Sequence, residues 1–238
     1  MNDIFQQRVD AVRARIASAC ARCGRAPGSV LLVAVSKTHP PETVEEVARC
    51  GISVFGENKV QEAGAKIPLC PSHLTWHLVG HLQSNKVRLA VELFDTIHSV
   101  DSLRLMELID RACDAVGRRM KVLVEVNVSG EASKFGMKPE AVPAVLAAAG
   151  KLPRIDLLGV MTMPPFTEDP QKARPHFQAL RNLRDGWQTR LGIPLPELSM
   201  GMSHDFEVAI EEDATMIRVG TSIFGTRAPR KVVSDDES

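Results

Sequence analysis

The sequence predicts an α/β fold, a single TIM-type (β/α)8 barrel with an extra N-terminal helix. Short apolar segments alternate with segments of helical periodicity about eight times along the 238 residues. Several of these short segments are apolar on both faces, as are the strands of a buried parallel sheet. No linker or low-complexity segment divides the chain. A doubly wound open sheet is the alternative, but eight regular units favour a closed barrel near the lower size limit of that fold.

The extra helix is expected over residues 5–23, where apolar side chains recur at helical spacing with arginines between them. Gly24 and Pro27 end this helix. The first strand is expected over residues 30–37. This run is apolar on both faces and carries Lys37 at its far end.

The next three units repeat the alternation of strand and helix. Pro40 and Pro41 open a helix, because proline fits the first helical turn. A further helix is expected after Asn58 and ends at Lys66. The other expected elements are strands over 52–55, 74–79 and 94–100, and helices over 40–50, 85–91 and 101–116.

The fifth strand, expected over 120–128, shows the clearest alternation, with a valine at every second position from 122. Glu125 and Asn127 lie between these valines and are expected to point into the barrel near its top. Ser203 is expected as the N-cap of a later helix, with Asp205 in its first turn. The remaining expected elements are strands over 155–163, 197–200 and 215–219, and helices over 139–149, 172–190, 203–211 and from 221 onward.

Composition narrows the class of protein. Basic and acidic residues are equal in number, 29 each, which predicts no general attraction to nucleic acid or to an anionic membrane. There is no apolar segment of the roughly 20 residues that span a bilayer, and five irregularly spaced cysteines favour free thiols in a reducing compartment. A cytoplasmic protein is expected, with a domain over 1–227 and a disordered polar tail over 228–238.

Lys37 is the first candidate for chemistry, because the carboxyl ends of parallel strands carry the active residues in barrels of this type. A low-dielectric interior favours the neutral amine, which forms a Schiff base with an aldehyde. The alternative is a lysine whose charge reaches solvent at the end of a buried strand. The strand alone leaves both interpretations open.

The loops after the seventh and eighth strands are the usual phosphate site of TIM barrels. Ser203 and Thr221 offer hydroxyl and backbone N–H groups there, and Gly220 allows close approach. Two ordinary capped turns are the alternative interpretation. Because the eighth strand of a closed barrel lies beside the first, a phosphate here and an amine at Lys37 would suit one phosphorylated aldehyde.

Motifs along nearly the whole chain resemble those of the YggS/PROSC family, the pyridoxal phosphate homeostasis proteins, whose barrel resembles the barrel domain of alanine racemase. The resemblance implies that Lys37 carries pyridoxal 5'-phosphate as a covalent aldimine. It also implies that Ser203 and the Gly220–Thr221 backbone hold the phosphate, that Asn58 lines the pocket, and that Arg218 faces the pyridine nitrogen. The matching stretches are Leu32-Val-Ala-Val-Ser-Lys37, Phe55-Gly-Glu-Asn58, Trp76-His-Leu-Val-Gly80-His-Leu-Gln83-Ser-Asn85-Lys86, Val126-Asn127-Val-Ser-Gly130 with Lys134 and Gly136, Ser199-Met-Gly-Met-Ser203, and Ile217-Arg218-Val-Gly220-Thr221 to Phe224-Gly225.

The same resemblance bears on catalysis. An arginine donates to an unprotonated ring nitrogen, which makes the ring a weaker electron sink. A racemase of this type also needs a tyrosine delivered by a second domain, and the chain contains no tyrosine. A carrier of pyridoxal phosphate without robust catalytic activity is therefore expected, as a monomer, with apo forms of pyridoxal phosphate enzymes as candidate recipients. The alternatives are a pyridoxal phosphate-dependent racemase or lyase, and a barrel enzyme that uses Lys37 as aldolases do.

Three other patterns lead to weaker expectations. His73, His77 and His81 recur every fourth residue, but along a strand this spacing spans about 13 Å, so no metal site is expected. Lys134 is expected to be a solvated lysine, with a role as a secondary acceptor of the cofactor as the alternative. Asp213 stands where the family pattern has glycine, and aspartate tolerates the positive φ that a glycine would permit.

Overall fold

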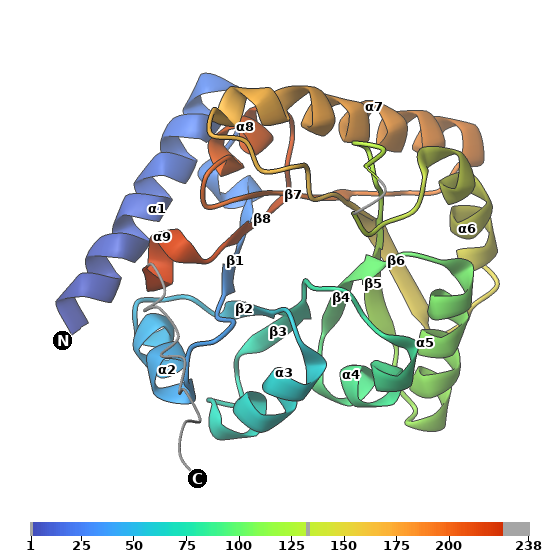
Figure 1. Cartoon of the computed structure of the whole chain (residues 1–238), viewed down its shortest axis with the longest axis horizontal. Helices are drawn as coiled ribbons and strands as arrows, with labels where there is room; N and C mark the ends of the chain where they lie inside the picture. The colour runs from blue at the N-terminus through green and yellow to red at the C-terminus, as the bar shows by residue number, and fades with distance from the viewer. Residues whose placement is uncertain (1, 132–133, 226–238) are drawn as a thin grey trace, which may run out of the picture.

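The computed structural model describes residues 2–131 and 134–225, and it confirms the expected TIM-type barrel. Eight parallel strands close into a ring in sequence order, because β1 pairs with both β2 and β8. Helices surround this ring, as Figure 1 shows. The expected tail over 228–238 and the domain boundary at residue 227 lie outside the described residues.

The elements alternate as the sequence predicts. The strands are β1 Leu31–Val35, β2 Val54–Glu57, β3 Thr75–Leu78, β4 Thr96–Val100, β5 Met120–Glu125, β6 Ile155–Met161, β7 Glu197–Met202 and β8 Met216–Val219. The α-helices are α1 Asn2–Arg22, α2 Pro41–Arg49, α3 Val60–Lys66, α4 Val87–Leu93, α5 Leu103–Ala115, α6 Val142–Ala149, α7 Arg174–Leu191, α8 Phe206–Glu211 and α9 Thr221–Phe224. Short 3-10 turns span Pro27–Ser29, Ile67–Leu69, Ser84–Lys86, Pro139–Ala141 and Pro170–Ala173.

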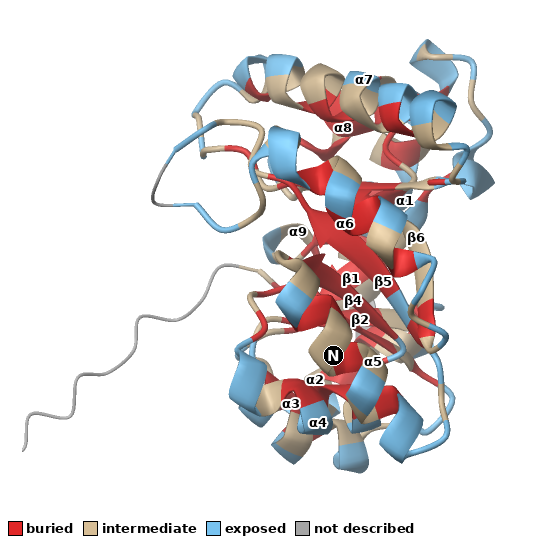
Figure 2. Cartoon of the chain, turned by 90° about the vertical axis from the view of Figure 1, so that its right-hand side faces the viewer, coloured by how far each residue is buried: buried red, intermediate tan, exposed pale blue. Residues whose placement is uncertain are grey.

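The core has two parts, because alternate residues of each strand face opposite sides of the barrel wall. On β1, Ala34 belongs to the large apolar layer between strands and helices, whereas Val33 and Val35 form a small cluster with Val79. Figure 2 shows buried residues on the strands and on the inward faces of the helices. The barrel interior therefore has its own small apolar cluster, between β1 and the residue that follows β3.

The extra helix α1 packs on the outside of the barrel against α2, α8 and α9 (Figure 1). Arg15 lies over the ring of Phe206, with its guanidinium carbon 4.4 Å from the ring centroid. This helix therefore covers the elements that follow β7 and β8. No helix in the described part of the chain is long and apolar enough to cross a membrane.

Several local expectations were wrong. β1 ends at Val35 rather than at Lys37, and β5 ends at Glu125 rather than at residue 128. β2 spans Val54–Glu57 rather than 52–55, because Gly56 and Glu57 pair with β3 instead of forming a turn. Ser203 is not an N-cap: β7 continues to Met202, and α8 begins only after Asp205. The side chain of Asn127 does not point into the barrel; its Nδ2 donates to Glu131 O at 2.9 Å, in the loop after β5.

Asp213 adopts the left-handed backbone conformation expected at its position, with φ of 70°. Aspartate is one of the few residues other than glycine that enter this region without large strain. The turn into β8 is therefore formed without the glycine of the family pattern.

Candidate functional site

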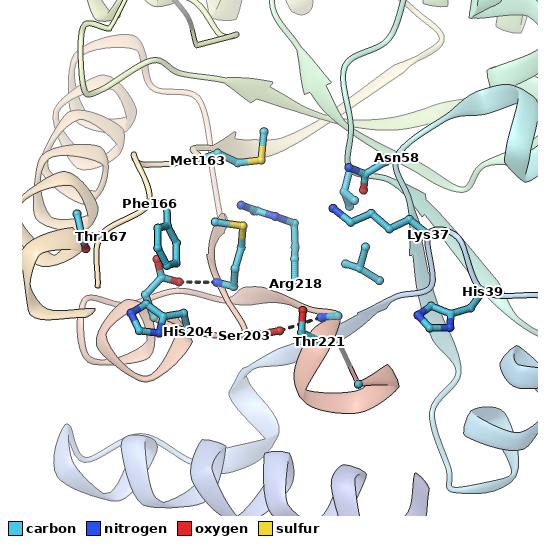
Figure 3. Close-up of a pocket in the computed structure, with 16 residues that line it drawn as sticks. Lys37, His39, Asn58, Met163, Phe166, Thr167, Ser203, His204, Arg218 and Thr221 are labelled. Carbon is cyan, nitrogen blue, oxygen red and sulfur yellow. Dashed lines mark hydrogen bonds between the residues drawn. The ribbon is translucent and has the colours of Figure 1, made fainter. Parts of the chain in front are cut away.

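A cavity of about 270 Å³ opens at the carboxyl ends of the strands. Its walls come mainly from the segments that follow β1, β2, β6, β7 and β8 (Figure 3). The six site residues expected from the sequence all line it: Lys37, Asn58, Ser203, Arg218, Gly220 and Thr221. The fold therefore brings together side chains that lie up to 184 positions apart in the chain, from 37 to 221.

Lys37 stands two residues beyond the end of β1 and is half-buried. Its side chain extends into the cavity between Asn58 and Arg218, as Figure 3 shows. Strand order explains both neighbours, since β1 lies between β2, which precedes Asn58, and β8, which carries Arg218. A Cβ at Gly80 would lie 2.3 Å from the carbonyl oxygen of Asn58, so a glycine at that position lets the Asn58 backbone approach β3 closely.

Ser203 joins the two loops that were expected to hold a phosphate. Its Oγ accepts the backbone N–H of Gly220 at 3.1 Å and that of Ser222 at 3.3 Å. These two bonds use the acceptor positions of the hydroxyl, and its own hydrogen remains as a donor. A Cβ at Gly220 would lie 3.3 Å from the carbonyl oxygen of Val35, so this turn packs tightly on β1.

Arg218 is a charged residue of the cavity wall, and only 3% of it is exposed. Its guanidinium donates to Ser199 Oγ at 2.5 Å and to Thr162 O at 2.9 Å. Burial lowers the pKa of Arg218 to about 10, against the opposing charges of Glu125 and Asp205. The group is still protonated at neutral pH, and it can only donate hydrogen bonds.

Glu125 points toward the barrel interior, as expected, and is 2% exposed. Burial raises the pKa of Glu125 to about 7, although the charge of Arg218 acts in the opposite direction. Its Oε2 is buried without a hydrogen-bond partner. The carboxyl is therefore about half protonated near neutral pH.

A chain of neutral side chains crosses the interior and ends on Arg218. His77 Nδ1 lies 2.9 Å from His98 Nε2, and His98 Nδ1 lies 2.9 Å from Ser199 Oγ. Burial lowers the pKa of His77 to about 4 and that of His98 well below its ordinary value. Ser199 Oγ thus links Arg218, which donates to it, to His98, and the tautomer of each histidine sets which atom donates in the other two contacts.

This chain gives His77 a structural role in place of metal binding. Within residues 2–131 and 134–225, no group of three or more histidine, cysteine, aspartate or glutamate side chains could hold a metal ion. His73 is exposed, and His81 Nδ1 lies 3.3 Å from Asp101 Oδ2, so the three evenly spaced histidines occupy separate environments.

Sequence reasoning missed the wall that faces Lys37 across the cavity. Met163, Phe166 and Thr167 follow β6, and His204 follows β7 (Figure 3). Phe166 is 75% exposed, and its ring centroid lies 5.5 Å from that of His204. The only sequence signal was the proline-containing segment after the sixth strand, which indicates a loop but not its place beside the cavity.

Comparisons with known proteins identify relatives of this chain. The model of the family described as alanine racemase, N-terminal domain, matches residues 8–228. A pyridoxal phosphate homeostasis protein of Aquifex aeolicus is 45% identical over 222 residues, which cover 93% of this chain and 97% of the relative. The protein of the same name from Escherichia coli K12 is 40% identical over 235 residues, or 95% and 98% of the two chains.

Solved structures extend the likeness to three dimensions. PipY of Synechococcus elongatus, solved with pyridoxal phosphate bound, is 39% identical and has a TM-score of 0.81, over 93% of this chain and 100% of PipY. An alanine racemase of Clostridium difficile has a TM-score of 0.76 at 16% identity, over 98% of this chain and 59% of the racemase. The racemase comparison shows a shared fold only.

Proposed function

The chain belongs to the YggS/PROSC family of pyridoxal phosphate homeostasis proteins, and from that premise we propose that it binds pyridoxal 5'-phosphate in this cavity. In the proposal Lys37 holds the cofactor as a Schiff base, and the protein serves vitamin B6 homeostasis in the cytoplasm, as a monomer that supplies the cofactor to apo enzymes. The observation that carries the proposal is the convergence of Lys37, Ser203 and Arg218 on one cavity.

The cavity offers one group for each part of the cofactor. Pyridoxal phosphate supplies an aldehyde, a phosphate and an electron-withdrawing pyridine ring. The Lys37 amine suits the aldehyde, the hydroxyls of Ser203 and Thr221 suit the phosphate, and Asn58 suits the polar substituents of the ring. Val35 and Val79 add apolar wall beside these groups.

Arg218 is assigned to the pyridine nitrogen. A guanidinium with a pKa of about 10 does not readily transfer its proton, so it donates a hydrogen bond and leaves the nitrogen unprotonated. The bound ring is then a weak electron sink. Since the chain also contains no tyrosine to act as a second acid or base, the proposed role is that of a carrier without robust catalysis.

The absorbance spectrum of the purified protein with added pyridoxal phosphate tests this proposal. The wild-type protein is expected to show the visible band of a protonated Schiff base, and borohydride reduction is expected to remove the band. Lys37→Ala should abolish the band because it removes the only amine assigned to the aldehyde. Lys151→Ala, which removes an exposed lysine ahead of β6, should leave the band unchanged.

An unaltered spectrum in Lys37→Ala would refute the assignment of the lysine. Turnover of an amino acid well above that of free pyridoxal phosphate, lost with Lys37, would instead support a racemase or lyase. A colourless protein with no affinity for pyridoxal phosphate would favour a barrel enzyme that acts on another phosphorylated substrate.

A further inference from the structure

The backbone directly after Lys37 adopts an unfavourable conformation. Thr38 has φ of 67°, in the left-handed region, and is one of two non-glycine residues with positive φ among those the structure describes. Threonine is β-branched, and for such residues this region is a genuine outlier. Strain of this kind persists only where surrounding contacts hold the segment in place.

Glu62 on α3 supplies one such contact. Its Oε1 accepts the backbone N–H of Thr38. Burial alone raises the pKa of Glu62, but the hydrogen bonds from Thr38 and Lys66 outweigh it and lower the pKa below its ordinary value. Glu62 is therefore ionised at neutral pH and makes a charge-assisted hydrogen bond to the strained residue.

Lys66, one turn further along α3, holds the residue on the other side of Lys37. Its Nζ donates to the carbonyl oxygen of Ser36 at 2.9 Å. The same ammonium contacts Glu57 Oε1 at 2.6 Å and Glu62 Oε1 at 3.2 Å, so each of its three hydrogens has an acceptor. The lysine is only 5% exposed.

The side chain of Ser36 completes the cluster. Its Oγ donates to Glu57 Oε1 at 2.7 Å, on the carboxylate that Lys66 also contacts. The residues before and after Lys37 are thus tied to one buried cation, Ser36 directly and Thr38 through Glu62. None of Glu57, Glu62 and Lys66 lines the cavity, and their hydrogen bonds to Ser36 and Thr38 reach the backbone on both sides of Lys37.

We propose that Glu62, held by Lys66, is a positioning residue that keeps Thr38 in its left-handed conformation and thereby directs Lys37 into the cavity. This inference rests on the proposed function, because it assumes that Lys37 reacts with the aldehyde of pyridoxal phosphate. Without Glu62, Thr38 relaxes toward an ordinary conformation, and Lys37 reaches the reactive geometry in a smaller fraction of molecules.

Two substitutions test the inference together. Glu62→Ala removes the acceptor of the Thr38 N–H, while Lys66 keeps its contact with Glu57, so the protein is expected to fold. Thr38→Gly in the Glu62→Ala background restores a residue that adopts positive φ without strain. The matched control is Glu45→Ala on α2, which removes a surface ion pair with Arg49 at the same i,i+4 spacing as Glu62 and Lys66.

Three quantities are measured in each variant: the rate at which the visible band appears with pyridoxal phosphate, hydrogen exchange of the Thr38 amide, and the melting temperature of the apo protein. Glu62→Ala is expected to slow the band about tenfold, equivalent to about 1.4 kcal/mol, and to remove protection of the Thr38 amide. The double variant should return to within about threefold of wild type. Glu45→Ala should change neither the rate nor the protection of the Thr38 amide.

The outcomes separate this inference from the proposed function. An unchanged rate in Glu62→Ala, or a slow rate that Thr38→Gly does not rescue, would overturn the positioning role while the band itself remains. A slow rate explained by a lower melting temperature alone, with the Thr38 amide still protected, would overturn it as well. Absence of the band from the wild-type protein would overturn the proposed function and this inference with it.

Discussion

Lys37 and Arg218 lie on two sides of the cavity and are held in place by different kinds of contact. On the β1 side, Lys37 lies in a turn beyond its strand, and the buried ions Lys66 and Glu57, together with the half-buried Glu62, hold the flanking backbone. On the β8 side, Arg218 lies within its strand and donates to neutral oxygens at the end of a neutral chain.

The location of each residue explains the difference. Strand pairing with β1 fixes the Arg218 backbone, so only its side chain needs orientation, and neutral acceptors provide it. Lys37 lies two residues beyond the end of β1, and its turn contains a strained residue. Charged side chains hold this turn. Removing one of them is expected to cost more stability than removing a neutral partner, because it leaves another buried charge uncompensated.

Lys66→Met is expected to have the largest effect on stability. It leaves the carboxylate of Glu57 buried without its cation, which should lower the free energy of unfolding by about 3–5 kcal/mol. Urea unfolding measures the change. Arg49→Met, which breaks an exposed pair with Glu45, should change it by less than about 1 kcal/mol. Equal losses in the two variants would show that the buried cluster is no more important than a surface pair.

Glu125→Gln is expected to change how the free energy of unfolding depends on pH. The folded-state pKa of Glu125 is about 7, above its ordinary value of 4.5. Between pH 4.5 and pH 7 the folded protein therefore keeps a proton on Glu125 that the unfolded chain has lost. The resulting stabilisation is present below pH 4.5 and is lost as pH rises through 7. The glutamine variant should therefore gain stability relative to wild type between pH 5 and pH 8, by about 1–3 kcal/mol.

Urea unfolding of both proteins at the two pH values measures this gain. Glu92→Gln on the surface of α4 serves as the control and should show no pH-dependent difference. A difference between Glu125→Gln and wild type that is constant with pH would mean that Glu125 is ionised throughout this range in the folded protein.

Ser199→Ala is expected to have a smaller effect on stability than Lys66→Met. It removes one acceptor from Arg218 and one hydrogen-bond partner from His98, and an unpaired buried polar group costs about 1–3 kcal/mol. The same variant should weaken binding of pyridoxal phosphate, because Arg218 keeps only its bond to Thr162. Thermal unfolding and a spectroscopic titration measure the two effects; unchanged binding would show that the neutral chain does not orient Arg218.

The fold and much of the cavity wall were predictable, because they depend on local patterns. Buried parallel strands and amphipathic helices have distinct periodicities, and both recur along the chain. Lys37, Ser203 and Gly220 lie where strands end, and closure of the barrel gathers strand ends at one face. Their roles toward pyridoxal phosphate remain predictions.

The local predictions were wrong where a residue type occurs in two kinds of structure. Gly56 resembles a turn signal but lies within β2, paired with His77. Ser203 resembles an N-cap, but its hydroxyl accepts backbone N–H groups from the loop after β8. In both positions a tertiary partner outweighs the local preference, because strand pairing and loop packing satisfy the backbone groups that a turn or cap would satisfy.

The sequence by itself determined the barrel, its family and the lysine at the end of the first strand, since these follow from periodicity and from motifs along the chain. Only the tertiary structure decided what holds that lysine. Glu62 lies 24 positions from Thr38, Lys66 lies 30 positions from Ser36, and Ser199 lies 101 positions from His98. No local pattern encodes such pairs, because their hydrogen bonds form only when the barrel closes and excludes water from their surroundings.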